Sequence, residues 1–295
     1  MTAQIINGTE IAKQIREELK QEIAELKAKH NLVPGLATVL VGEDPASQVY
    51  VGQKEKASLA LGIYSERHDL PTQTTQPELL ALVDKLNKSS KIHGILVQLP
   101  LPKHLNETEV LYAIDPRKDV DGFHPMNLGK LLIGEPDYIP CTPHGIQQLL
   151  IRSGVKIDGA EVVVVGRSNI VGKPIANILL QKKPGANATV TICHTGTRDI
   201  AFHTHRADIL IVAAGRPKAI TTDMVKEGVV VIDVGVNRIG KTAEGKDILV
   251  GDVDFEGVKE KAKAITPVPG GVGPMTITML MLNTVRAAKL AAGIA

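Results

Sequence analysis

The stretch that decides the fold reads "EVVVVGRSNIVGKP", from Glu161 to Pro174. Its four consecutive valines predict a short buried strand, and residues 172–181 predict a helix. The loop between them lies where a doubly wound sheet holds a phosphate at a helix N-terminus. The loop departs from G-x-G-x-x-G, because Ser168 stands where the second glycine would be. A plain strand-to-helix turn with a packing glycine is the alternative.

The charges that follow this loop favour NADP over NAD. An NAD site generally places Asp or Glu about 20 residues beyond the first glycine, against the ribose 2′-hydroxyl. Residues 162–198 contain no Asp or Glu, but they contain Arg167 and four other basic residues. A guanidinium can make a forked contact with a phosphate. We therefore expect Arg167 to anchor the 2′-phosphate of NADP, with the Thr195 hydroxyl in support.

Apolar strands and amphipathic helices alternate on both sides of a segment rich in Pro, Gly and Asp, residues 115–143. Continuous apolar strands are typical of parallel sheets covered by helices. The expected fold class is α/β, with two α/β domains around a cleft. The second domain is expected to be a Rossmann-like doubly wound parallel sheet, and the C-terminal helix to return to the first. The expected boundaries are 1–140 plus 275–295, and 141–274.

Composition excludes several classes of protein. The 295 residues are 43% hydrophobic and 22% charged, as in a globular protein with sizeable cores. A net charge of +2 with only 2% aromatic residues argues against nucleic-acid binding. Apolar runs such as residues 209–214 are far shorter than the ~20 residues of a membrane span. Cys141 and Cys193 stand far apart, which predicts a reduced, cytoplasmic protein without a metal site.

Polar residues of the first domain are candidates for chemistry. Tyr50 and Lys54 stand four apart on an expected helix and so share one face. Gln98 closes an apolar strand, at the edge where open α/β sheets carry ligands. Asp121 lies in an acidic loop, "DPRKDVDGFHP". Each also has a simpler explanation: a surface pair, a glutamine bonded to nearby backbone, and an Asx turn.

A second proline- and glycine-rich loop, "TPVPGGVGPMT" from Thr266 to Thr276, precedes the C-terminal helix. Three prolines and three glycines make a backbone that is stiff and open to close approach. A flat ligand could lie against it, and a plain helix-entry loop is the alternative.

Together these stretches resemble the bifunctional methylenetetrahydrofolate dehydrogenase/methenyltetrahydrofolate cyclohydrolase family over essentially the whole chain. The motifs that carry the resemblance are, in order, "YVGQKEKA", "GILVQLPLP", "DVDGFHPMNLG", "PCTPHG", "VVVVGRSNIVGKP", "TVTICHTGT", "VIDVGVNR" and "TPVPGGVGPMT". The resemblance implies NADP-dependent oxidation of 5,10-methylenetetrahydrofolate to the 5,10-methenyl cation and its hydrolysis to 10-formyltetrahydrofolate. It also implies a homodimer in which both steps share one interdomain cleft.

The resemblance further implies residue roles. Lys54 would move protons, Gln98 would hold it, Tyr50 would orient folate and lysine, and Asp121 would bind the pterin. Further substrate-binding positions would be Val97, Leu99, Pro269, Gly270, Gly271, Val272 and Gly273. The cofactor positions would be Gly166, Arg167, Ser168, Thr195 and Val236.

Two other functions stay open at this point. One is an NAD(P)-dependent dehydrogenase of an amino or hydroxy acid, whose first domain would bind that acid. The other is a nucleotide-sensing protein without catalysis, although the intact set of polar residues in the first domain argues against it. His203 and His205 lack the companions of a H-E-x-x-H metal site, so no metal is expected.

Overall fold

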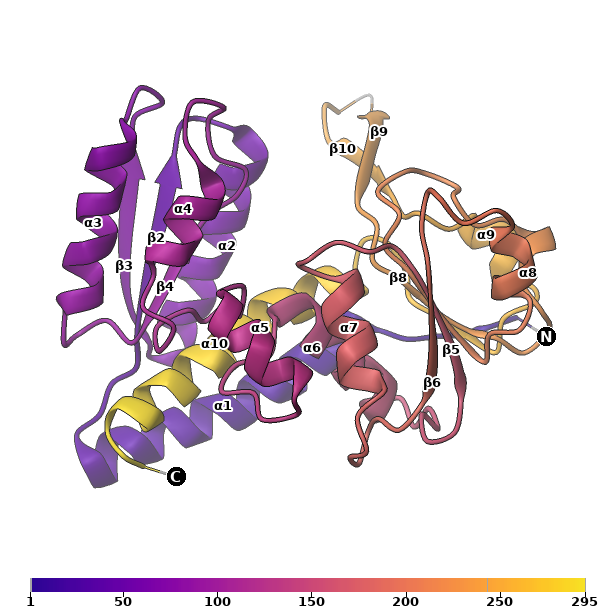
Figure 1. The fold of residues 1–295 in the computed structure, drawn as a ribbon, viewed down its shortest axis with the longest axis horizontal. Coiled ribbons are helices and arrows are strands. Elements are labelled where there is room, and N and C mark those ends of the chain that lie inside the picture. Colours follow the sequence, from indigo (N-terminus) through magenta and orange to yellow (C-terminus); the bar gives the residue numbers. More distant parts are fainter. Residues whose placement is uncertain (1, 243, 295) are drawn as a thin grey trace. The chain divides into compact units, whose positions relative to one another are not determined.

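The computed structural model describes residues 2–242 and 244–294 (Figure 1). The chain divides into two compact units, each built from two stretches of sequence. Unit 1 comprises Met1–Lys13 and Thr142–Thr276, and unit 2 comprises Gln14–Cys141 and Ile277–Ala295. Two long helices, α1 (Gly8–His30) and α10 (Val272–Ala291), each begin in unit 1 and end in unit 2.

Unit 2 contains a parallel sheet with the strand order β3-β2-β4 among its described residues. The strands are β2 (Gly35–Val41), β3 (Tyr64–Leu70) and β4 (Gly94–Val97). The central strand β2 is buried along its whole length, because helices cover the sheet and strands flank it (Figure 1). The helices between the strands and after them are α2 (Pro45–Leu61), α3 (Gln76–Lys88), α4 (Glu107–Ala113) and α5 (Pro125–Leu132).

Local signals set the ends of the helix that carries the candidate lysine. The Asp44 carboxylate accepts the backbone N–H of Ser47 at 2.8 Å and so caps α2 at its N-terminus. Gly62 ends the helix in the left-handed conformation, with a φ of 82°. These caps set the two ends of α2, the helix that carries Lys54.

Unit 1 contains a parallel sheet with the strand order β1-β11-β8-β7-β5-β6 in the described part of the chain. The strands are β1 (Gln4–Ile5), β5 (Glu161–Val165), β6 (Thr189–Cys193), β7 (Ile209–Val212), β8 (Val230–Asp233) and β11 (Ala264–Ile265). After β5 the chain adds β6 on one side and β7 on the other, so the strand order reverses there. Such a reversal is the topological switch point at which doubly wound sheets bind ligands.

Short helices and a hairpin complete unit 1. They are α6 (Cys141–Arg152), α7 (Gly172–Leu179), α8 (Ile200–Thr204), η1 (Thr222–Met224), α9 (Phe255–Lys259) and the hairpin of β9 (Asn237–Lys241) and β10 (Asp247–Val250). The two-part α/β architecture with a doubly wound parallel sheet confirms the expected fold class. No helix among the described residues is both long enough and apolar enough to cross a bilayer.

The units differ from the expected boundaries at the N-terminus. The first strand pairs in parallel with β11, with Gln4 opposite Ala264 and Ile5 opposite Ile265. The backbone N–H of Ile6 also donates to the carbonyl of Ile265 at 2.9 Å. The first residues therefore cluster with the doubly wound sheet rather than with the stretch that follows them in sequence.

Two expected elements also differ in extent. The apolar strand expected to close at Gln98 is β4, which ends one residue earlier, at Val97. Prolines 100 and 102 lack the N–H that a sheet ladder requires, so the chain leaves the sheet before them. The segment 115–143, which is rich in Pro, Gly and Asp, contains helix α5 and the start of α6.

Candidate active site

The candidate lysine lies on α2 and contacts the glutamine that follows β4. Lys54 Nζ donates to Gln98 Oε1 at 2.9 Å. Gln98 is held in turn, because its backbone N–H donates to the carbonyl of Val39 at 2.8 Å and its Nε2 donates to the carbonyl of Leu99 at 2.6 Å. With Nε2 engaged, the amide presents its oxygen to the ammonium. The predicted pair therefore forms a direct contact within unit 2.

Burial shifts the pKa values of Lys54 and the nearby Asp121 in opposite directions. Desolvation lowers the pKa of the Lys54 ammonium, and attraction to Asp121 opposes that change. Desolvation also raises the pKa of Asp121 to about 6, against the attraction of Lys54. Both shifts favour the neutral form of each group. An amine and a carboxyl whose pKa values are shifted toward each other are suited to acid–base chemistry.

The loop that carries Asp121 is fixed by the buried Asp119. The Asp119 carboxylate accepts the backbone N–H groups of Phe123 at 3.2 Å and His124 at 2.8 Å, and the side-chain Nδ2 of Asn127 at 2.8 Å. These bonds close the turn around Asp121. The acidic loop is therefore an Asx-bonded turn through Asp119, while Asp121 remains available for other contacts.

Two further residues of this site escaped the sequence analysis. The Cys141 thiol donates to the carbonyl of Val120 at 3.4 Å and lies 3.8 Å from Asp121 Oδ1. Asn283, on α10, donates to the carbonyls of Val120 at 2.8 Å and Ile139 at 2.9 Å. A lone asparagine in the apolar run "TITMLMLNTV" was the available signal, because a buried amide must find partners.

The remaining folate candidates of unit 2 surround this contact. Tyr50 lies one turn before Lys54 on α2 and is 42% exposed. Val97 is the last residue of β4 and is buried, whereas Leu99 is partly exposed. The structure thus brings Lys54, Gln98 and the Asp121 loop together and leaves the Tyr50 ring accessible to a ligand.

The glycine loop of unit 1 occupies the switch point after β5. A Cβ on Gly166 would lie 2.3 Å from the carbonyl oxygen of Ala213, and one on Gly172 would lie 2.2 Å from the oxygen of Gly166. Only glycine fits at either position. The Ser168 hydroxyl accepts the N–H groups of Val171 at 3.1 Å and Gly172 at 3.3 Å, at the N-terminus of α7. A serine therefore organises the turn at the position where the common fingerprint has its second glycine.

The predicted phosphate anchor meets a residue that sequence reasoning missed. Arg167 Nη1 lies 3.4 Å from Nε2 of His194, the first residue after β6. Thr195 follows His194 and is exposed. The three side chains are carried by the ends of adjacent strands, and the guanidinium supplies the positive charge for an anion. The motif "TICHTGT" contained the histidine, but it has no spacing that marks it.

The other candidates of unit 1 lie on loops. Val236 follows β8 and is 49% exposed. Pro269, Gly270 and Gly271 lie on the loop before α10, whereas Val272 and Gly273 are the first two residues of that helix. The carbonyl of Gly270 accepts the N–H of Thr9 at 3.1 Å. The start of α1 therefore holds the loop before α10, which carries candidate folate-binding residues, within unit 1. The peptides Leu99–Pro100 and Val268–Pro269 are cis.

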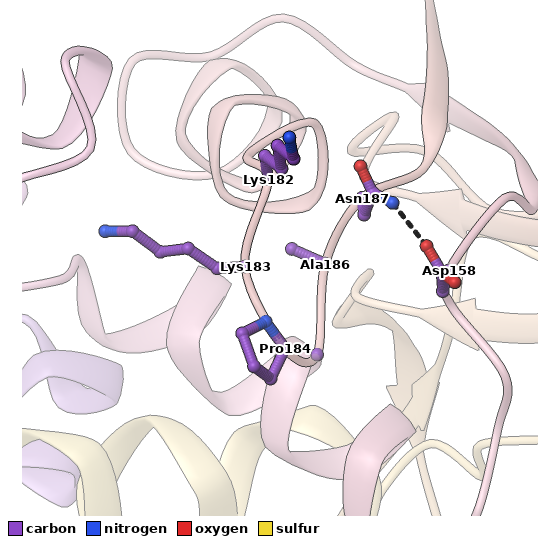
Figure 2. A pocket seen from close by; sticks show the side chains of 7 residues that line it. Asp158, Lys182, Lys183, Pro184, Ala186 and Asn187 are labelled. Carbon is purple, nitrogen blue, oxygen red and sulfur yellow. Dashed lines mark hydrogen bonds between the residues drawn. The ribbon is translucent and has the colours of Figure 1, made fainter.

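Two hollows in unit 1 contain none of the expected site residues. One, of about 340 Å³, lies over the loop that links α7 to β6 and is shown in Figure 2, where Asn187 Nδ2 donates to Asp158. The other, of about 710 Å³, is lined by residues of the β9–β10 hairpin, the start of α9 and Pro267. Among residues 2–242 and 244–294, no cluster of His, Cys, Asp and Glu is suited to hold a metal ion.

A doubly wound sheet with a phosphate-type loop at its switch point defines a dinucleotide-binding α/β protein. In unit 2 the Lys54–Gln98 hydrogen bond lies close to the Asp121 carboxyl. Residues 6–121 match the tetrahydrofolate dehydrogenase/cyclohydrolase catalytic domain, and residues 140–292 match the NAD(P)-binding domain of the same family. The chain belongs to the tetrahydrofolate dehydrogenase/cyclohydrolase family.

Individual relatives agree with this assignment. The chain is 68% identical over 294 residues to the bifunctional protein FolD of Syntrophus aciditrophicus, covering 100% of both. The crystal structure of the bifunctional enzyme FolD from Campylobacter jejuni is 48% identical, with a TM-score of 0.91, covering 98% of this chain and 99% of that one. The Trypanosoma brucei enzyme, complexed with NADP cofactor and inhibitor, is 40% identical, with a TM-score of 0.93 and 99% coverage of both chains. The resemblance predicted from the motifs is confirmed.

Proposed function

We propose that the chain catalyses two consecutive reactions of one-carbon metabolism. It oxidises 5,10-methylenetetrahydrofolate to 5,10-methenyltetrahydrofolate with NADP⁺, and it hydrolyses the methenyl cation to 10-formyltetrahydrofolate. The observation that carries the proposal is the Lys54–Gln98 hydrogen bond of 2.9 Å, in a chain that also has a phosphate-type loop at a switch point. Family membership over both matched domains supports it.

In the hydrolytic step Lys54 moves the protons. Water that adds to the methenyl carbon loses a proton, and the ring nitrogen that leaves this carbon gains one. Desolvation lowers the pKa of the Lys54 ammonium, so Lys54 releases its proton more readily than an exposed lysine and can return it. Gln98 fixes the direction of the amine, since its Oε1 accepts from Nζ. Proton transfer by a positioned group of this kind contributes ~10²–10⁴-fold to a rate.

Other residues bind and orient the folate. Asp121 accepts hydrogen bonds from the pterin, and Tyr50 stacks on it and orients Lys54. The further substrate-binding positions are Val97, Leu99 and Gln98, the loop residues Pro269, Gly270 and Gly271, and Val272 and Gly273 at the start of α10. The fixed turn around Asp121 and the anchored loop at Gly270 support these roles.

The doubly wound sheet binds NADP through Gly166, Arg167, Ser168, Thr195 and Val236. Bound NADP⁺ supplies the hydride acceptor of the first step. Arg167, beside His194, holds the 2′-phosphate, because a guanidinium can present two donors to it. In this proposal residues 141–274 form the NADP domain together with the N-terminal stretch that pairs with β11, and residues 14–140 with 275–295 form the folate domain.

The proposal extends to assembly and location. The protein forms a homodimer in the cytoplasm and acts on tetrahydrofolate derivatives without nucleic acid. Both cysteines are buried and free, as expected in a reducing compartment. Sedimentation equilibrium tests the assembly, since a single species of monomer mass would contradict it.

The activity test follows cofactor reduction with purified protein. We expect NADP⁺ and 5,10-methylenetetrahydrofolate to give a rise in reduced-cofactor absorbance, and NAD⁺ to give a smaller one. In parallel, 5,10-methenyltetrahydrofolate without cofactor should disappear faster than in buffer. Folded protein that reduces NADP⁺ only with an amino or hydroxy acid would refute the proposal in favour of the other dehydrogenase class.

A further inference from the structure

Two aspartates that the proposed chemistry does not use are buried at the carboxyl edge of the unit 1 sheet. Asp233 is the last residue of β8 and is 2% exposed, and Asp252 follows β10 and is fully buried. Figure 1 shows β8, which ends at Asp233, and the β9–β10 hairpin, which precedes Asp252. A buried carboxylate is costly unless hydrogen bonds satisfy it, so its partners reveal what it holds.

Asp252 holds two loops that are separate in sequence. Its Oδ2 accepts the backbone N–H of Ala214 at 2.6 Å and that of Gly215 at 2.8 Å, directly after β7. Its Oδ1 accepts the side-chain Nδ2 of Asn237 at 2.8 Å, at the start of β9. A Cβ on Gly235 would lie 2.2 Å from the Asp252 carboxyl carbon, so the loop after β8 packs directly on this group.

Asp233 in turn holds the backbone at Asp252. Its Oδ1 accepts the backbone N–H of Asp252 at 2.9 Å and that of Gly235 at 3.0 Å. Its Oδ2 accepts the N–H of Val253 at 3.0 Å. The two carboxylates therefore form one connected unit, which we call the aspartate brace, consisting of Asp233 and Asp252.

The brace supports both segments that are expected to touch the dinucleotide. Ala213, next to the held Ala214, packs its carbonyl against the position where Gly166 would carry a Cβ, at 2.3 Å. Val236 lies between Gly235, which packs on Asp252, and Asn237, which donates to it. The Asp252 carboxylate thus fixes the segment after β7 that packs against Gly166, and it also fixes the residues on both sides of Val236.

We propose that Asp252 is a positioning residue for NADP, seated by Asp233. It aligns the loop after β7 and the Val236 loop before the cofactor arrives, so less conformational freedom is lost on binding. The inference rests on the proposed function, because it assumes that NADP binds at this edge. Neither aspartate contacts the reacting atoms in this proposal.

The test is Asp252→Asn, assayed for both reactions. An amide has one oxygen, so its NH₂ must face either the N–H groups of Ala214 and Gly215 or the Nδ2 of Asn237. We expect KM and Kd for NADP⁺ to rise at least tenfold, with kcat at saturating NADP⁺ within about threefold of wild type. Hydrolysis of 5,10-methenyltetrahydrofolate without cofactor should change little, since it needs no dinucleotide.

Two control variants separate positioning from general damage. Asp247→Asn removes a carboxylate from the exposed surface of β10, where it pairs with Arg238, and should leave KM unchanged. Val258→Ala opens the core of unit 1, because Val258 is fully buried, and should lower the melting temperature without raising KM for NADP⁺. If Asp252→Asn fails to fold, Asn237→Ala removes one contact to the brace and should still raise KM with kcat retained.

The outcomes are distinguishable. An unchanged KM in a folded Asp252→Asn protein, or an equal rise in Val258→Ala, overturns the brace while the proposed function stands. In the fallback case, an unchanged KM in Asn237→Ala does the same. A wild-type protein that neither binds NADP⁺ nor reduces it overturns both.

Discussion

Replacing Gln98 by leucine tests the acid–base centre most directly. The side chains are similar in size, so the main loss is the 2.9 Å hydrogen bond from Lys54 Nζ to Gln98 Oε1. Desolvation already lowers the pKa of Lys54, and the glutamine oxygen stabilises its charged form. Without that oxygen the ammonium is harder to keep protonated, so the pKa of Lys54 should fall further.

The size of the change follows from the charge on the donor. A hydrogen bond to a charged group contributes about 1.5–3 kcal/mol. At 1.36 kcal/mol for each tenfold change, its loss corresponds to roughly a ten- to hundredfold lower proton affinity of the amine. Gln98→Glu provides the opposite perturbation, because a carboxylate at the same place attracts the ammonium and should raise the pKa of Lys54.

The assay is the pH dependence of kcat/KM for hydrolysis of 5,10-methenyltetrahydrofolate, corrected for the uncatalysed rate. The limb governed by Lys54 should move to lower pH in Gln98→Leu and to higher pH in Gln98→Glu. An NMR titration of protein with ¹³C-labelled lysine checks that the moving group is Lys54. A limb that stays in place, or that moves in the same direction in both variants, would refute the reasoning.

Four further predictions concern other parts of the molecule. Lys54→Met should abolish cyclohydrolase activity while measurable dehydrogenase activity remains, because hydride transfer does not use its proton; equal loss of both rates in the two assays would remove this role. Arg167→Ala should raise KM for NADP⁺ roughly ten- to hundredfold, as a lost charge-assisted bond of ~1.5–3 kcal/mol implies, and change KM for NAD⁺ far less; an unaltered preference would place the 2′-phosphate elsewhere. Burial raises the pKa of Asp233 to about 6, so the folded protein binds more protons than the unfolded chain between pH 3.8 and 6. As pH rises through that window, ionisation of Asp233 should lower the free energy of unfolding by up to about 3 kcal/mol. Urea unfolding at several pH values should show this decrease, and the Asp233→Asn variant should lack it. Leu79→Ala should lower the free energy of unfolding by about 2–5 kcal/mol in the same denaturation assay, because Leu79 is fully buried in unit 2. A loss well under 1 kcal/mol would mean that neighbouring side chains fill the cavity left by the leucine.

The strands that the sequence predicted are those with continuous apolar runs. β5 and β7 carry four consecutive buried apolar residues each, and such runs can be recognised without knowing their neighbours. β3, which reads "YSERHDL", gave no such signal, because it is a partly exposed edge strand with charged side chains. β1 is two residues long, so no periodicity exists to detect. Its pairing depends on a partner near the other end of the chain.

The site was predictable where motifs carried it. Lys54 and Gln98 came from two motifs, and the structure joins them by a hydrogen bond. His194 and Asp252 could not be found in this way, because their partners lie on segments that are distant in sequence. A side chain that bonds to the backbone of another loop leaves no pattern in its own stretch. Such residues become visible only when the fold brings the loops together.

The parallel pairing of β1 with β11 has a consequence for synthesis. The edge strand β1 is synthesised long before Ala264 and Ile265, the residues with which it pairs. Until Ala264 and Ile265 have been synthesised, the β1 segment has no partner strand to join, and its later capture must overcome the entropy of closing a very long loop. Nascent chains stalled before Ala264 should expose the β1 segment to an endoprotease, whereas chains that contain β11 should protect it.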